Sequence, residues 1–188
     1  MNMAAPNTSG LWWRRILVVL AMAVVVHLLA VWAAPYIIMH ALMQGALVQN
    51  KITHNQAAFP PPVNAKVKTV VMPSPDLLYS ICAYDLSDGP VRISANPQLR
   101  SYWSLALYSA NSDNFFVIND LQAAHQPVDL WLVAGDADQP SLAPAQGTQV
   151  VHSPSTKGFL LMRVLTADYE AEKSIVEPAR RTLVCRNA

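Results

Sequence analysis

The sequence predicts a mainly β protein, in which a single N-terminal transmembrane helix precedes an antiparallel β-sandwich-like domain with one C-terminal helix. Three observations predict this fold. An uncharged apolar run occupies residues 16–39, a proline-rich stretch follows it, and eight short runs rich in Val, Ile, Leu and aromatic residues then alternate with turn-forming residues. The chain has 188 residues, enough for one typical domain in addition to a membrane anchor.

The first element is an apolar segment with no Lys, Arg, Asp or Glu between Arg15 and Lys51. At about 1.5 Å per residue, residues 16–39 form a transmembrane helix of roughly 36 Å, which crosses a hydrocarbon core of about 30 Å with some tilt. Arg14 and Arg15 precede this segment. The positive-inside rule therefore makes residues 1–15 a short cytoplasmic tail and places the bulk of the chain across the membrane.

A cleaved signal peptide is the alternative interpretation of this segment, because Val31 and Ala33 are small residues that resemble a cleavage site. The apolar run continues beyond that point, which favours a retained helix. Both interpretations export the domain that follows.

Residues 40–63 are predicted to form a helical extension and then a proline-rich spacer, because consecutive prolines favour an extended polyproline segment. The exported β-rich domain covers residues 64–188. Its predicted strands are KVKTVVM (66–72), LLYSICAYDL (77–86), VRISA (91–95), SYWSLALYS (101–109), NFFVIN (114–119), VDLWLVAG (128–135), TQVVHS (148–153) and KGFLLMRVL (157–165).

One helix closes the domain. Thr166 or Asp168 can cap its start, acidic residues in its first turns suit the helix dipole, and Pro178 is expected to end or kink it. The tail that follows, TLVC, can form a last strand that returns Cys185 to the sheet.

Charge and cysteine content restrict the partners and the compartment. Of the 13 Lys and Arg residues, Arg14 and Arg15 precede the anchor, and all 12 Asp and Glu residues follow it. The positive and negative charges of the domain nearly balance. This argues against nucleic acid as a partner, because phosphate binding needs a basic surface. Cys82 and Cys185 form no CxxC pair, so an exported domain favours a disulfide between them, with two buried thiols as the alternative.

Three stretches of the chain carry a family resemblance: PSPDLLYS (73–80), YDLSDGPVRIS (84–94) and LRSYWSLALYSANSDNFFVIN (99–119). They resemble the bacterial family catalogued as domain of unknown function 1254. The positions that fit are Pro73, Asp76, Leu78, Tyr79, Ser80, Asp85, Leu86, Ser87, Gly89, Pro90, Tyr102, Trp103, Asn114 and Phe115. Ser74 and Leu77 depart from the opening motif, where the family has an amide and a hydroxyl.

The resemblance implies a β-sandwich-like fold. Because the family is bacterial, the apolar segment and its flanking charges predict a bacterial inner-membrane protein, with the N-terminus cytoplasmic and the bulk of the chain periplasmic. Long family members fuse this domain to a second one, of the 1214 type. A short membrane-anchored form therefore implies a companion chain that carries the 1214-type domain. The resemblance implies no biochemical activity.

Candidate chemistry is sparse, because the sequence holds no nucleophile elbow, zinc-protease motif, Walker loop or dinucleotide-binding motif. An alternative ligand-binding site is predicted at Asp76, Tyr79, Asp85 and Trp103. Its two carboxylates serve as acid and base if the fold brings them together, or bind turn amides if it does not. We predict no catalytic residue and no metal site.

The apolar segment carries one ionisable residue, His27, with Ala23, Ala30 and Ala34 at three- and four-residue offsets along the same side. Small residues permit close helix approach, and a polar group between them can bond across the contact. These four residues are therefore a predicted transmembrane interface. Ligation of a haem or chlorophyll-type pigment by His27 is the alternative.

Two functions remain open. The first is a single-pass membrane-anchored accessory or assembly protein, whose exported β-domain binds other proteins of a membrane complex. The second is an enzyme or small-ligand carrier of the cell envelope, with its site in the β-sandwich.

Overall fold

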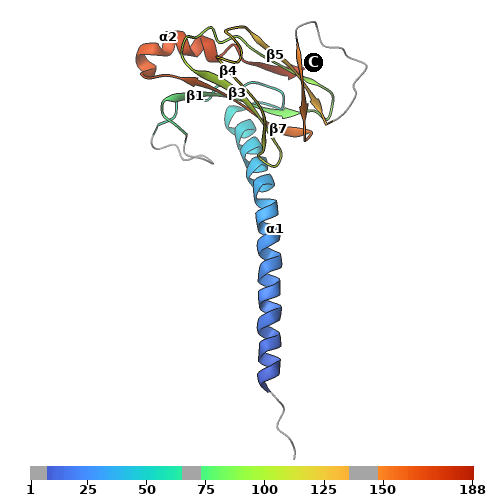
Figure 1. Ribbon diagram of the computed structural model, residues 1–188. Coiled ribbons are helices and arrows are strands. Elements are labelled where there is room, and N and C mark those ends of the chain that lie inside the picture. The colour runs from blue at the N-terminus through green and yellow to red at the C-terminus, as the bar shows by residue number, and fades with distance from the viewer. Residues whose placement is uncertain (1–7, 65–72, 136–147) are drawn as a thin grey trace, which may run out of the picture.

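The computed structural model describes residues 8–64, 73–135 and 148–188 (Figure 1). A long apolar helix, α1 (Thr8–Asn50), leads into a mainly β domain, as predicted. The domain consists of β1 (Leu77–Asp85), β2 (Val91–Ala95), β3 (Trp103–Ser109), β4 (Asn114–Asn119), β5 (Val128–Ala134), β6 (Gln149–Ser153), β7 (Lys157–Leu165), α2 (Tyr169–Arg180) and β8 (Val184–Asn187). Seven predicted strands correspond to β1 through β7, and the tail forms β8. The strand predicted at residues 66–72 lies outside the described residues.

The described strands form two four-stranded sheets. Sheet A has the order β1-β7-β3-β4 and is antiparallel throughout, whereas sheet B has the order β6-β5-β2-β8. The predicted antiparallel sandwich-like fold is confirmed, with the exception of one pair of strands: β5 and β6 run parallel. Parallel neighbours need a crossover of about a dozen residues or more, and residues 135–148 provide that length.

The main hydrophobic core lies between the two sheets, because alternate residues of each strand point to the same face. In β3, Trp103, Leu105 and Leu107 point into this core, with at most 1% of each residue exposed, and Ser104 and Ala106 on the opposite face are buried as well. The other large side chains of this core include Leu78, Tyr84, Val91, Ile93, Leu130, Leu132, Leu160 and Met162.

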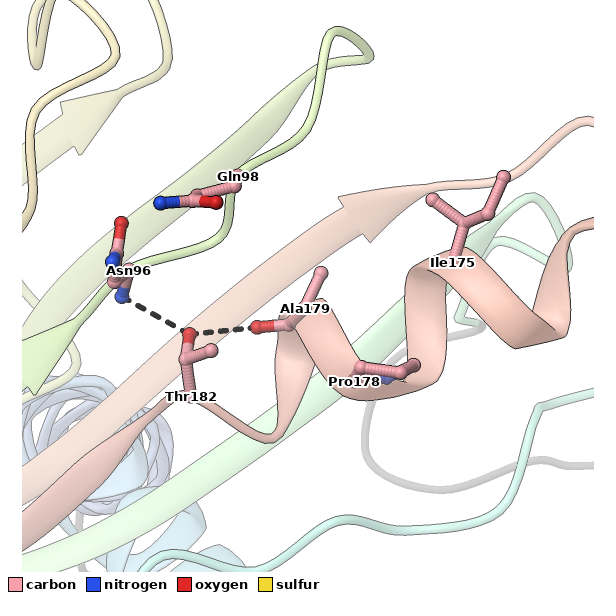
Figure 2. Close-up of a pocket in the computed structure, with 6 residues that line it drawn as sticks. All are labelled: Asn96, Gln98, Ile175, Pro178, Ala179 and Thr182. Carbon is pink, nitrogen blue, oxygen red and sulfur yellow. Dashed lines mark hydrogen bonds between the residues drawn. The ribbon is translucent and has the colours of Figure 1, made fainter.

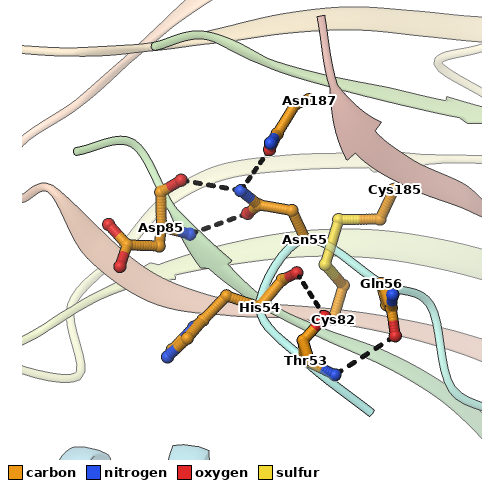
Figure 3. Close-up of a disulfide and its surroundings, with 8 residues drawn as sticks. All are labelled: Thr53, His54, Asn55, Gln56, Cys82, Asp85, Cys185 and Asn187. Carbon is orange, nitrogen blue, oxygen red and sulfur yellow. Dashed lines mark hydrogen bonds between the residues drawn. A yellow bond between two sulfur atoms is a disulfide. The ribbon is translucent and has the colours of Figure 1, made fainter. Parts of the chain in front are cut away.

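The predicted disulfide between Cys82 and Cys185 is confirmed, and it joins the two sheets. Cys82 lies in β1 of sheet A and Cys185 in β8 of sheet B, with their Cα atoms 6.5 Å apart. Both residues belong to the main core (Figure 3). The bridge therefore ties the last strand of the chain across the core.

The C-terminal part of α1 packs on the outer face of sheet A and forms a second hydrophobic core there. The helix contributes Met39, Met43 and Ala46, and the sheet contributes Ile81, Ala83 and Phe159. The three helical positions recur at i, i+4 and i+7, so they share one side of the helix. Figure 1 shows this end of α1 against the sheet and the rest of the helix projecting away from the domain. α1 continues through Pro35 without a break.

Residues 51–63, which belong to the predicted helical extension and proline-rich spacer (40–63), pack on the domain. Asn55 binds both backbone groups of Asp85 through its side-chain amide, at 2.8 Å each. Ala58 forms an isolated antiparallel bridge with Ile81, and the carbonyl of Pro60 accepts a hydrogen bond from Arg180. Prolines cannot donate backbone hydrogen bonds, but the residues before them can, and these attach the segment to β1.

The helix α2 begins as predicted at Asp168, whose carboxylate accepts hydrogen bonds from the backbone N–H groups of Glu170 and Ala171. Pro178 does not end the helix, which continues to Arg180. Its buried side chains are Val176, Ala179 and Arg180.

Candidate functional site

The two carboxylates proposed as an acid–base pair lie at opposite ends of β1. Asp76 immediately precedes this strand and Asp85 is its last residue. At about 3.3 Å per residue, the strand separates them by roughly 30 Å, far beyond the reach of a shared proton. Asp76 is exposed in the turn before β1, and its backbone carbonyl accepts a hydrogen bond from Thr166. The structure therefore does not bring the pair together.

Asp85 stabilises the turn that follows β1. Its carboxylate accepts hydrogen bonds from the backbone N–H and the hydroxyl of Ser87, at 3.0 and 2.6 Å, and pairs with Lys157 at 2.9 Å. Burial raises the pKa of Asp85, but the bonds from Ser87 and Lys157 outweigh this effect and lower the pKa to about 2 from 3.8. A carboxylate held this strongly in its charged form suits turn stabilisation better than proton transfer at neutral pH.

This environment predicts an acid-dependent loss of stability. Because the folded-state pKa of Asp85 lies below the unfolded value, its contribution is present above about pH 4 and is lost as the pH falls towards 2. We expect the Asp85→Asn variant to lose about 1 kcal/mol at pH 7, since Lys157 is half exposed and solvent screens the pair. Urea unfolding at several pH values should show the two curves converging near pH 2. Asp88→Asn, in the same turn, serves as control, and a constant gap between Asp85→Asn and the native chain would contradict the assignment.

Tyr79 and Trp103 face opposite sides of sheet A. Trp103 pairs with Val164, which also pairs with Leu78, and all three point into the main core. Tyr79 follows Leu78 and therefore points to the outer face, where its hydroxyl accepts a hydrogen bond from the backbone N–H of Ser74 at 2.9 Å. The four residues of the alternative ligand site thus do not line one cavity.

A shallow pocket of about 330 Å³ lies between α2 and the loop after β2 (Figure 2). It is lined by Asn96, Gln98, Ile175, Pro178, Ala179 and Thr182. Thr182 links the two sides of the pocket, because its hydroxyl accepts a hydrogen bond from the backbone N–H of Asn96 and donates one to the carbonyl of Ala179. No lining residue is charged. The pocket therefore offers amide groups and apolar contact but no general acid or base.

Arg180 is the most highly connected buried polar residue that sequence reasoning missed. It is 2% exposed, and its guanidinium donates to the carboxylate of Glu177 through Nε and Nη2. Nη1 donates to the carbonyls of Pro60 and Tyr79 at 2.8 and 2.9 Å. One side chain thus joins α2, β1 and the segment after α1. The Glu177–Arg180 spacing along a helix was a visible signal, but it does not reveal burial.

The residues of the predicted transmembrane interface, Ala23, His27, Ala30 and Ala34, are all exposed on α1. The N-terminal part of α1 projects away from the domain (Figure 1). The segment from Trp12 to Asn50 is long and apolar enough to cross a membrane. A pigment at His27 would need cover from another chain, because this chain alone leaves the imidazole exposed. The interface itself stays a prediction.

Comparison with known proteins identifies the domain. Among curated proteins, none matches the chain. The VPA0106 protein from Vibrio parahaemolyticus is similar in structure, with a TM-score of 0.61 and 18% identity over 81% of this chain and 35% of that one. An uncharacterized protein from Burkholderia cenocepacia gives a TM-score of 0.44 and 17% identity over 70% of this chain and 37% of that one. The chain spans about a third of the length of both solved proteins.

A family model described as a protein of unknown function, DUF1254, matches residues 49–187. This range begins at the end of α1 and includes the segment that Arg180 and Asn55 attach to β1, together with β1 through β8. The predicted resemblance is confirmed: the chain belongs to the DUF1254 family.

Proposed function

We propose that this protein is a single-pass, membrane-anchored accessory or assembly subunit, whose exported β-domain binds another protein of a membrane complex. The observation that supports this proposal is the exposed edge strand β4 of sheet A. β4 is the last strand of sheet A in the described part of the chain, and no residue of β4 is fully buried. Val117 on this strand is 48% exposed, and Leu121 just after it is 78% exposed.

An unpaired edge strand with exposed apolar side chains is a template for a partner. Its backbone groups can pair with a further strand, and its apolar side chains can be buried in the contact. The alternative, an envelope enzyme or small-ligand carrier, receives less support, because Asp76, Tyr79, Asp85 and Trp103 do not converge. The pocket beside α2 is the place where such a ligand would be sought.

Membrane anchoring is supported by the apolar length of α1 and by its aromatic residues. Trp12 contacts Trp13 near one end of the apolar segment, and Trp32 contacts Tyr36 near the other. Arg14 and Arg15 favour a cytoplasmic N-terminus, and the disulfide favours an oxidising compartment such as the periplasm for the domain. Retention of the helix is favoured because the apolar run continues beyond the candidate cleavage site at residues 31–33.

The partner we propose is a membrane protein, with a companion chain that carries a 1214-type domain as the leading candidate. The chain spans 35% of the similar solved protein from Vibrio parahaemolyticus, which leaves room for such a second part in that protein. A contact between helices, through Ala23, His27, Ala30 and Ala34, would add to the contact of the β-domain.

Co-purification tests the edge directly. The full-length chain is extracted from its native membrane in mild detergent, and bound proteins are identified and quantified by mass spectrometry. We expect Val117→Lys combined with Leu121→Lys to reduce the bound partner by about tenfold or more, because a central apolar contact contributes about 2 kcal/mol or more. The matched control is Val150→Lys with Val184→Lys, two valines that are 43% and 42% exposed on the two edge strands of sheet B.

A second variant distinguishes a partner contact made by α1 from one made by the β-domain. Ala23→Leu, His27→Leu and Ala30→Leu together keep the segment apolar but remove close approach and the polar group. Reduced binding in this variant alone would assign the contact to α1. If the native chain retains a stoichiometric small molecule and no protein, the accessory role is wrong and the ligand-carrier alternative is supported.

A further inference from the structure

The aromatic residues of α1 indicate where the helix crosses the two boundaries of the hydrocarbon core. The helix rises by about 1.5 Å per residue, so Trp12 and Trp32 lie roughly 30 Å apart along its axis. This distance equals the thickness of a hydrocarbon core. Tryptophans prefer the boundary between the hydrocarbon and the headgroups. Because the transmembrane segment begins after Arg15, the same length of about 30 Å counted from residue 16 ends near Tyr36. The headgroup layer on the domain side therefore begins between Trp32 and Tyr36, which contact each other, and continues for roughly 5–7 Å along the helix.

The β3–β4 hairpin reaches this level. Its turn, residues 110–113, lies beside α1, and the hydroxyl of Ser112 donates a hydrogen bond to the carbonyl of Pro35 at 3.2 Å. Pro35 is three residues after Trp32, or about 4.5 Å further along the helix. Ile37 and Ile38, which follow, are 65% and 48% exposed, so the apolar surface extends even beyond this contact.

The hairpin is held in this position from two sides. The second core begins at Met39, only one turn after Pro35, and joins α1 to Phe159 of β7 and Ile81 of β1. Within the turn, Ser109 and Asp113 are joined by a backbone hydrogen bond of 2.9 Å, and the N–H of Ala110 donates to the hydroxyl of Ser155. The domain therefore cannot lift the turn away from α1 without exposing apolar surface.

We propose that the tip of the β3–β4 hairpin, Ala110 to Asp113, lies in the lipid headgroup layer of the membrane that α1 spans. The proposal rests on the membrane anchoring proposed above. At the tip the Asn111 amide donates to the Asp113 carboxylate, and the Ser112 hydroxyl donates to Pro35. The second amide hydrogen of Asn111 and the oxygens of Ser112 and Asp113 remain able to bond to the phosphate and ammonium of zwitterionic lipids. The β-domain would thus be docked on the bilayer in one orientation, with the β3–β4 end of sheet A nearest the lipid.

The other end of the same contact lies far from the membrane. From Pro35 to Asn50 the helix rises by about 22 Å, and Asn55, just beyond it, binds Asp85 at the end of β1. β1 and β3 run in the same direction on either side of β7, so the ends of these two strands lie about 10 Å apart across sheet A. Asp88, in the turn after β1, is therefore expected roughly 10 Å further from the membrane than the hairpin tip, and the two turns differ in depth only if the domain is held on α1 as described.

Spin-label accessibility in liposomes of zwitterionic lipid measures these depths. Single cysteines are introduced in the full-length chain as Leu28→Cys, Ser112→Cys, Asn114→Cys and Asp88→Cys, all at exposed positions. Asn114→Cys, next to the turn, leaves the Ser112–Pro35 bond intact. Each label is tested against oxygen, which concentrates in the hydrocarbon, and a water-soluble nickel complex.

We expect the Leu28 label to report bilayer depth, the Asp88 label bulk water, and the Ser112 and Asn114 labels the headgroup region between them. If the Ser112 and Asn114 labels are as accessible to nickel as the Asp88 label while Leu28 is shielded, the docking is wrong and the anchoring stands. If the Leu28 label is itself accessible to nickel, the anchoring and the docking both fail.

Discussion

Replacing both Cys82 and Cys185 by alanine is expected to destabilise the β-domain by about 4–5 kcal/mol. The two residues are 103 positions apart, and the chain-entropy model assigns a stabilisation of this size to a loop of about a hundred residues. The bridge also joins sheet A to sheet B through the main core, so its loss frees β8 from β1. Alanine is chosen because a serine hydroxyl at these buried positions would add a desolvation cost.

Pulse proteolysis of the full-length chain in detergent, across a urea gradient, measures the unfolded fraction of the domain. We expect the midpoint to fall by about 2 M urea, given a slope of about 2 kcal/mol per M for a domain of this size. Reducing agent should shift the native chain towards the variant and leave the variant unchanged. Equal midpoints for the native chain and the variant would show that the bridge does not constrain the unfolded chain.

Replacing Arg180 by methionine is expected to cost about 3–5 kcal/mol, the usual effect of removing one partner from a buried ion pair. Arg180 is 2% exposed, and the substitution removes a bidentate bond to Glu177. It also leaves the carbonyls of Pro60 and Tyr79 without the donor that satisfies them. Because Pro60 belongs to the segment after α1, we also expect faster proteolytic cleavage in residues 51–64.

The neighbouring residue provides the matched control. Arg181 pairs with the same Glu177 at 3.0 Å, but its side chain is 56% exposed. Arg181→Met removes the same charge and should cost less than about 1 kcal/mol, since exposed ion pairs contribute little. Its guanidinium also lies over the ring of Phe59, 5.2 Å from the centroid, so a small part of that cost is stacking. Similar losses in both variants would mean that charge, and not burial, explains the effect of Arg180.

The sequence alone was sufficient for the features that depend on neighbouring residues. The apolar run of α1 and the cap at Asp168 are local patterns, and the structure contains both of them. The disulfide followed from there being only two cysteines in a chain expected to be exported. The family resemblance also rested on short motifs with a fixed order, and the family match confirms it.

The tertiary structure decided whatever depends on residues that are distant in sequence. Asp76 and Asp85 are close in sequence, but an extended strand holds them far apart, so the carboxylate pair was never assembled. Residues 51–63 have the composition of a spacer, yet Arg180 binds the carbonyl of Pro60 from the far end of the chain. The parallel pairing of β5 with β6 and the burial of Met39 under sheet A are likewise contacts between separate elements. Local periodicity determines which face of a strand or helix is apolar, but only packing determines what covers that face.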